Sequence, residues 1–463
     1  MKKFAKLALC ASIGLCTAPI ANAANWFDIQ TISLPEWGSG KLIGFVQPLY
    51  TDYSANSVTS GPVHDQTAKF NLVQPTSNQT SDLFVQRARL FVRGSINPDI
   101  SYYVGTEMGQ NGYDYSFGSY SPRLIDANVV FSNYIPGIRL EVGNIRAPGP
   151  EGAMEGFMDF NLLDMFPTGI TQLMQPTFYN SSAAYAQIGH PINTGQPYAV
   201  PAANVSGNNG FRYPGVQAED WFMVAPQTEV AYGLMLADYG RLFDQGTSNG
   251  PIIAGRLQAS YLLDDPETIK SCDYCKRFFR NDLTGFIWAQ QAHPSIMGVE
   301  STMKRDGFGM TFRDGYMQHG GLNIKAEYFE GSGNIVAPAV FNTFPGAQPQ
   351  LTNELVYIGS QNKASGYSAS AGYFLDKNWE LVARYDYYDR LPNLADQERI
   401  FKDKAVMAVY HMTPMNKIVV DYIDRSLGIP NPGAIPAGPQ RALAESIAGS
   451  IGNQFDIWAV FAF

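Results

Sequence analysis

The sequence predicts an all-β protein, a transmembrane antiparallel β-barrel of about 16 strands spanning residues 24–463, after a signal peptide at residues 1–23. Three observations lead to this prediction. Most of the chain alternates apolar and polar residues in short segments, separated in turn by tight turns and long loops. Charged residues make up only 16% of the chain, against about 25% in average proteins. The chain also closes on an aromatic strand, Phe455–Phe463.

The amino terminus has the three parts of a secretory signal. Three lysines lie within the first six residues, residues 7–18 form an apolar run, and Ala21-Asn22-Ala23 offers a cleavage site. The run is too short to cross a bilayer as a helix, which takes about 20 residues. We therefore expect export with cleavage near Ala23. Loss of the three lysines takes the formal charge from -9 to -12, which argues against a nucleic-acid partner.

The last nine residues alternate with the period of a β-strand. Phe455, Ile457, Ala459, Phe461 and Phe463 share one parity and therefore one face. The segment resembles the closing strand of bacterial outer-membrane barrels, which ends in Phe and carries the assembly signal. We therefore expect this strand to close the barrel.

Five strands are predicted in the first third of the chain. They are Leu42–Tyr53, Phe84–Arg93, Ile100–Met108, Ile125–Ser132 and Ile138–Val142. Asn97-Pro98-Asp99 and Ile135-Pro136-Gly137 have turn residues, whereas residues 54–81 and 111–122 form long loops. In the fourth strand we expect Ile125, together with every second residue after it, on the outer apolar face.

Residues 148–226 are the least strand-like part, and we expect one or two strands near residues 183–188 and 218–225. Alternation then resumes in strands near residues 230–236, 255–261, 283–290, 308–312, 322–328, 367–373, 379–387, 406–412 and 418–422. Asp376-Lys377-Asn378 marks a clear hairpin turn.

The strand count is even, as in single-chain bacterial barrels, and barrels of 16–18 strands leave an aqueous channel. No second layer in the sequence could cover the apolar face, so we expect that face to meet outer-membrane lipid. A soluble β-sandwich or propeller is the alternative, but no blade repeat is present to support a propeller.

Three segments resemble the phosphate-selective porin O/P-like family. Gln86–Gly94 (QRARLFVRG) resembles its second-strand motif, Val142–Pro148 with Glu151 resembles the stretch that opens its long third loop, and Trp379–Asp386 resembles a late strand. The resemblance implies a barrel whose third loop folds inward to narrow the channel, and a homotrimer. Arg146 stands where the family has Lys, and the dense basic ladder of phosphate-selecting members is missing. The resemblance therefore implies a porin without implying phosphate.

Charged residues on the inward parity are candidates for the channel lining, since a charge on the lipid face costs about 2–4 kcal/mol near the midplane. The basic candidates are Arg87, Arg89, Arg93, Arg139, Arg256, Lys325 and Arg384. The acidic candidates are Glu107, Asp126, Glu141, Glu327 and Asp386, with Glu380 and Asp421 on the same parity. They either oppose a basic strip to an acidic one across a constriction, or pair across strands and brace the wall.

Residues 148–182 are the candidate constriction loop. The charged candidates in or beside it are Arg146, Glu151, Glu155, Asp159 and Asp164. The loop is rich in Met, Phe and Leu, which would be buried if it folded into the barrel. The alternative is a plug against the inner wall with no role in selectivity.

Cys272 and Cys275 are the only cysteines after the signal peptide, and we expect a local disulfide in the oxidising cell envelope. A redox thiol pair is the alternative, and haem attachment would need His where Lys276 stands. By the strand count this segment falls at the short-turn end, although residues 264–282 are long for a turn. Either the turn is decorated or the count is wrong by a hairpin.

We expect no enzyme, cofactor or metal, because no nucleophile–base pair, phosphate loop or metal-ligand spacing is present. The best prediction is a porin of the cell outer membrane that passes small hydrophilic solutes or ions by diffusion, with a mild preference for anions. One alternative is a barrel that sheathes a partner protein, as in porin–cytochrome electron conduits. Another is an adhesive barrel that acts through its loops at residues 54–81, 331–363 and 427–449.

Overall fold

The structure is a computed structural model. It describes residues 40–54, 56, 81–109, 122–154, 168–174, 177–178, 198–201, 205–206, 212–238, 250–264, 280–293, 295–296, 299–300, 302–338, 353–357 and 359–463. Several predictions lie outside the described residues: the signal peptide, the strand near residues 183–188, the loop acids Glu155, Asp159 and Asp164, and the pair Cys272 and Cys275.

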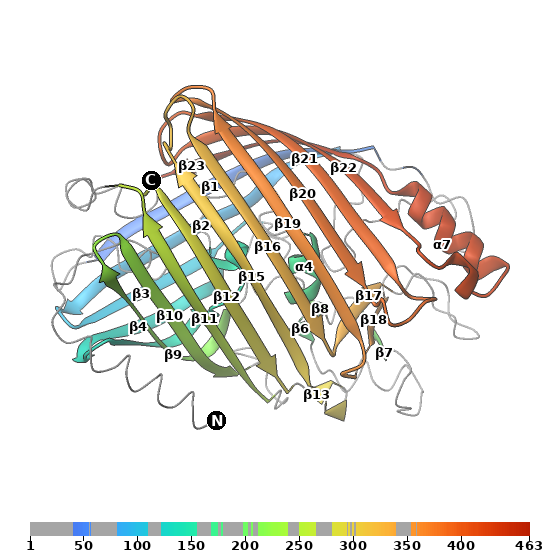
Figure 1. Cartoon of the computed structure of the whole chain (residues 1–463), viewed down its shortest axis with the longest axis horizontal. Helices are drawn as coiled ribbons and strands as arrows, with labels where there is room; N and C mark the ends of the chain where they lie inside the picture. Colours follow the sequence, from blue (N-terminus) through green and yellow to red (C-terminus); the bar gives the residue numbers. More distant parts are fainter. Residues whose placement is uncertain are drawn as a thin grey trace.

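Sixteen antiparallel strands form one closed barrel in which sequence neighbours pair and the first strand pairs with the last (Figure 1). The strands are β1 (Gly40–Tyr53), β2 (Ser81–Asn97), β3 (Ile100–Glu107), β4 (Arg123–Ile135), β5 (Ile138–Arg146), β9 (Arg212–Ala225), β10 (Thr228–Asp238), β11 (Pro251–Leu262), β12 (Asp282–Ala292), β15 (Met303–Asp314), β16 (Leu322–Ser332), β19 (Lys363–Phe374), β20 (Trp379–Arg390), β21 (Arg399–His411), β22 (Lys417–Gly428) and β23 (Gln454–Ala462). The predicted fold class is confirmed.

The strands alternate between the two faces of the wall, as the sequence predicts. In β12 every second side chain is buried, and the exposed ones between them include Ile287 at 57%. Leu257 at 49% and Phe308 at 59% show the same arrangement on their strands. Large apolar side chains thus face outward while polar and charged ones face inward, the reverse of a soluble protein.

The barrel closes where β1 meets β23. Phe45 lies opposite Ala462 in this antiparallel pair. The N–H of Gly44 donates to the carbonyl oxygen of Phe463 at 3.0 Å, and the N–H of Phe463 donates back to the carbonyl oxygen of Gly44 at 3.0 Å. The closing role expected of the terminal aromatic strand is therefore observed.

Short turns lie at one end of the barrel and long connections at the other. The connection from β11 to β12, which contains both cysteines, belongs to the short-turn end because it leaves the wall on the same side as the turn at residues 98–99. It is therefore a long connection at the short-turn end. The strand count that placed the two cysteines at this end is correct. In the described part of residues 148–226, one barrel strand, β9, follows β5.

One orientation was predicted wrongly. Ile125 was expected on the outer face, but it is only 3% exposed and belongs to an apolar cluster that includes Phe45 and Trp458. The register shifts here, since Gly105 pairs with Asp126 and Thr106 pairs with Leu124. Ile125 is the extra residue of this β-bulge, so it turns inward and Leu124, 42% exposed, takes the outer position.

Smaller elements lie in the long connections. The third connection holds helices α3 (Glu151–Met154) and α4 (Thr168–Met174) and strands β6 (Thr177–Phe178), β7 (Tyr198–Pro201) and β8 (Val205–Ser206). The others hold β13 (Ser295–Ile296), β14 (Val299–Glu300), β17 (Ile335–Pro338), β18 (Asn353–Tyr357), a 3₁₀ turn η3 (Pro432–Ala434) and helix α7 (Pro439–Ser450). Strands β7, β18 and β17 pair into a small sheet; β17, β18 and α7 lie at the long-loop end (Figure 1).

No helix in the described part of the chain is long and apolar enough to cross a membrane.

Candidate functional site

Arg256 of β11 binds the start of the third connection, which runs from β5 to β9, to the inner wall. Its Nη1 donates to the carbonyl oxygen of Gly149 at 2.8 Å and its Nη2 pairs with Glu151 Oε2 at 2.5 Å. The guanidinium also lies over the ring of Phe286, 4.0 Å from its centroid. Burial alone raises the pKa of the Glu151 carboxyl, but the charge of Arg256 outweighs it and leaves this pKa below its usual value. Glu151 is therefore ionised at neutral pH.

Glu327 of β16 caps the same segment. One of its carboxylate oxygens accepts from Trp288 Nε1 at 2.8 Å, and both accept from the backbone N–H of Glu151 at 3.3 Å. A carboxylate at the amino end of α3 satisfies a free N–H group there. Arg256 and Glu327, both predicted to line the channel, thus face inward but are buried at 3% and 8% exposure while they hold the third connection.

Arg305 of β15 binds the second helix, although it is not among the candidates predicted from the sequence. It is 2% exposed, and its Nε donates to the carbonyl oxygen of Leu173 in α4 at 3.0 Å. Its other nitrogens donate to the carbonyl oxygens of Lys304, Ser332, Gly333 and Asn334 at 2.8–3.2 Å. Its odd number, opposite in parity to the outward-facing Phe308, is the signal in the sequence that it faces inward.

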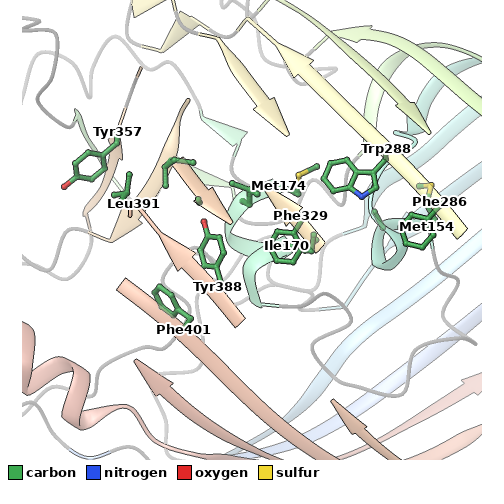
Figure 2. Close-up of a cluster of buried hydrophobic side chains, with 14 residues drawn as sticks. Met154, Ile170, Met174, Phe286, Trp288, Phe329, Tyr357, Tyr388, Leu391 and Phe401 are labelled. Atoms are coloured by element: carbon green, nitrogen blue, oxygen red, sulfur yellow. The ribbon is translucent and has the colours of Figure 1, made fainter. Parts of the chain in front are cut away.

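An apolar cluster holds α4 against the wall (Figure 2). Ile170 and Leu173 of the helix are 0% and 2% exposed. They belong to one cluster with Phe329 of β16 and Tyr388 of β20, and Trp288 and Met154 lie at the α3 side of it. Helices α3 and α4 of the third connection therefore pack against the inner wall, and the expectation that this loop folds inward is met for this part of it.

Several charged side chains of the inner wall neutralise one another. Arg89 pairs with Glu107 at 2.7 Å, and Arg384 pairs with Asp386 at 2.8 Å. Asp126 pairs at 2.7 Å with Arg212, which had not been singled out. All of them are buried, so these pairs brace the wall, which was the alternative interpretation of the inward charges.

Further inward candidates are also buried in the wall. Arg87 Nη1 donates to Gln47 Oε1 at 2.6 Å, and Arg93 is 7% exposed on the same strand. Glu380 lies 2.9 Å from His411 Nε2. Asp421 accepts from Trp458 Nε1 at 2.8 Å.

The inward charges that keep contact with solvent are mostly basic. Arg139, Arg146, Arg313 and Lys325 are partly exposed. Among the inward acids of the barrel strands whose side chains are described, none exceeds the 8% exposure of Glu327. Glu151 of the third connection is the partly exposed acid, and it lies within electrostatic reach of Arg313 and Lys325. The partly exposed charges named on the described wall strands are therefore basic.

No known family matches the sequence, and no curated protein matches it. Among solved structures, an anion-selective porin from Comamonas acidovorans superimposes with a TM-score of 0.52 at 11% identity, covering 92% of this chain and 99% of that one. This chain has the fold of outer-membrane porins.

Two further solved structures match over most of the chain. The outer-membrane channel DcaP of Acinetobacter baumannii has a TM-score of 0.48 at 11% identity, covering 93% of this chain and 100% of that one. OmpF of Salmonella typhi, solved with daunomycin, has a TM-score of 0.49 at 12% identity, covering 92% and 97%.

Proposed function

We propose that this porin-fold barrel is a passive diffusion channel of the outer membrane that prefers anions. The observation that carries the proposal is the lining of the described wall, where the inward acids of the strands are covered and the partly exposed charges, Arg139, Arg146, Arg313 and Lys325, are basic. A charge close to the path of a solute attracts counter-ions more strongly than the net charge of the whole chain does.

The two pairs of basic residues lie on different parts of the wall. Arg139 and Arg146 belong to β5, whereas Arg313 and Lys325 belong to the adjoining strands β15 and β16, near the anchored third connection. An anion that crosses the barrel therefore meets positive charge from more than one side. The formal charge, -9 for the whole sequence and -12 without residues 1–23, does not oppose this, because the strand acids inside the barrel are buried or paired.

Two further observations support the proposal. The segment Gln86–Gly94 resembles the second-strand motif of the phosphate-selective porin O/P-like family, and we assign the chain to that kind of porin without assigning phosphate as its solute. The Comamonas acidovorans porin, which superimposes with a TM-score of 0.52, is itself anion-selective. A homotrimer, removal of residues 1–23, narrowing by residues 148–182 and a Cys272–Cys275 disulfide are parts of the same proposal.

Single-channel conductance tests the proposal. The mature protein is refolded into a planar bilayer, and the reversal potential is measured across a salt gradient. We expect open steps with an anion-selective reversal potential, and a lower anion-to-cation permeability ratio in the double variant Arg313→Gln and Lys325→Gln. Lys304→Gln is the matched control, because Lys304 is exposed on the outer face of β15.

Two results contradict the proposal. Cation selectivity in the wild type overturns the anion preference. A folded barrel that never conducts overturns the channel itself and favours a sheath around a partner protein.

A further inference from the structure

Two buried glutamates share a single amide on the inner wall between β5 and β9. Glu141 is 0% exposed and Glu219 is 1% exposed. Gln217, directly opposite Glu141 in the strand register, is also fully buried. Its Nε2 donates to Glu219 Oε2 at 2.6 Å and to Glu141 Oε2 at 3.4 Å. One neutral nitrogen therefore serves two carboxyl groups.

This cluster has too few hydrogen-bond donors for its acceptors. Glu141 Oε1 and Gln217 Oε1 are buried and have no hydrogen-bond partner. No cationic side chain in the described part of the chain forms an ion pair with Glu141 or Glu219. Two ionised carboxylates in such a site would repel each other without a counter-ion, and buried like charges of this kind hold a proton between them.

Arg139 is the neighbouring cation, and it points elsewhere. It lies directly opposite Glu219 in the register, so the side chain is within reach of that carboxyl group. Its guanidinium instead lies 4.5 Å from the centroid of the Trp221 ring, and its Nε has no hydrogen-bond partner. Arg139 is one of the partly exposed basic residues of the lining.

The other charged groups around the pair leave this imbalance in place. On β4, Asp126 adds negative charge but is paired with Arg212. On β5, Arg146 acts at longer range. On β9, Asp220 accepts from the backbone N–H of Trp221. On β10, the residue opposite Glu219 is Gly233, which does not titrate.

We propose that Glu141 and Glu219 bind one proton between them, and that this proton sets how much positive charge Arg139 presents to the channel. With the proton bound, Arg139 stays over Trp221 and contributes to the anion-attracting lining. When the proton leaves to water, the pair gains a negative charge and Arg139 turns to Glu219. Acid conditions then strengthen the anion preference and alkaline conditions weaken it.

A bound metal ion explains the cluster less well than a proton. Two carboxyl groups and one amide oxygen are few ligands for a hard cation, which takes six or more oxygens. The described residues contain no group of three or more His, Cys, Asp or Glu side chains arranged to hold a metal.

The test combines selectivity with infrared spectroscopy of the folded protein. The reversal potential is measured between about pH 5 and pH 9, where unperturbed carboxyl groups are ionised throughout most of the range. We expect the anion-to-cation permeability ratio of the wild type to fall by about threefold towards alkaline pH, as expected for loss of one nearby charge in water. The infrared spectrum should show a protonated-carboxyl C=O band that disappears over the same range.

Glu219→Gln and Glu141→Gln are the test variants. Each should remove this pair's share of the infrared band and leave a permeability ratio that no longer changes with pH. Asp220→Asn is the matched control, one residue away on the outer face of β9, and should keep both signals. If one variant does not fold, the other assigns the band to this pair, and a wild type without any such band already overturns the inference.

This inference rests on the proposed function, and the two fail in different ways. A channel without anion preference at any pH overturns the proposed function, while the infrared band still reports the bound proton. An anion-selective channel whose selectivity ignores pH, or a wild type without a protonated-carboxyl band, overturns the inference. A pH response abolished by a metal chelator also overturns it, in favour of a metal ion.

Discussion

Replacing Arg305 by alanine should release helix α4 from the wall of the barrel. The side chain is buried, and its Nε–H is the donor that satisfies the carbonyl oxygen of Leu173 near the carboxy-terminal end of the helix. Such carbonyl groups have no partner within their own helix. In Arg305→Ala, α4 keeps its apolar contacts with the wall but loses this charged hydrogen bond.

The magnitude follows from that one bond. A hydrogen bond from a charged donor contributes about 1.5–3 kcal/mol, so the equilibrium between a docked and a released helix should shift by about 10- to 150-fold. The remaining bonds of Arg305 go to the backbone at the end of β15 and between Ser332 and Asn334. The loss of these bonds destabilises the backbone around Ser332–Asn334 and does not favour docking of the helix.

Single-channel recording measures the release. If the third connection narrows the channel, Arg305→Ala should show larger or fluctuating conductance steps, whereas Lys304→Ala, on the outer face of the same strand, should behave as the wild type. Arg305→Lys should be intermediate, since one ammonium group cannot reach all the carbonyl groups. A folded Arg305→Ala protein with wild-type conductance and noise would refute this reasoning.

Three further predictions concern the barrel itself. Asp376 accepts hydrogen bonds from the backbone N–H groups of Asn378 and Trp379, and these bonds lower its pKa. Asp376→Asn should therefore reduce the unfolding temperature at neutral pH. The difference in unfolding temperature between wild type and variant should vanish as the pH falls through that lowered pKa. Deletion of Phe463 removes two closing hydrogen bonds and should lower the yield of heat-modifiable, folded barrel in membranes. Trp458→Phe removes the donor to Asp421 and should lower the free energy of unfolding in urea by about 1.5–3 kcal/mol.

The inward or outward orientation of the wall residues could be predicted because it depends on neighbouring residues in the sequence. A period of two needs only neighbouring residues, so the outward positions of Leu257 and Phe308 and the inward positions of Arg89 and Glu107 followed from parity alone. The β-bulge at Ile125 is an exception to parity. One inserted residue reverses which positions face inward on one side of the bulge relative to the other side. Nothing in the hydrophobic pattern marked it.

The partners of the inward charges could not be predicted in the same way. Arg212 and Asp126 are 86 positions apart in the sequence, and Arg256 and Glu151 are 105 positions apart. The first pair depends on how β9 follows β5, and the second depends on how the third connection folds inward. Parity therefore identifies a charge as inward, but the tertiary structure decides whether it is neutralised, covered or open to solvent.

The seam between β1 and β23 has a consequence for how the chain reaches its folded state. Most paired strands of the barrel are neighbours in the sequence, but β1 and β23 pair Phe45 with Ala462 across nearly the whole sequence. Bringing such distant segments together costs about 5 kcal/mol of chain entropy, which no local turn offsets. Until the final strand arrives, both edges expose unpaired backbone groups that lipid cannot satisfy. The barrel should therefore close last at this seam, after the whole chain has been delivered to the membrane.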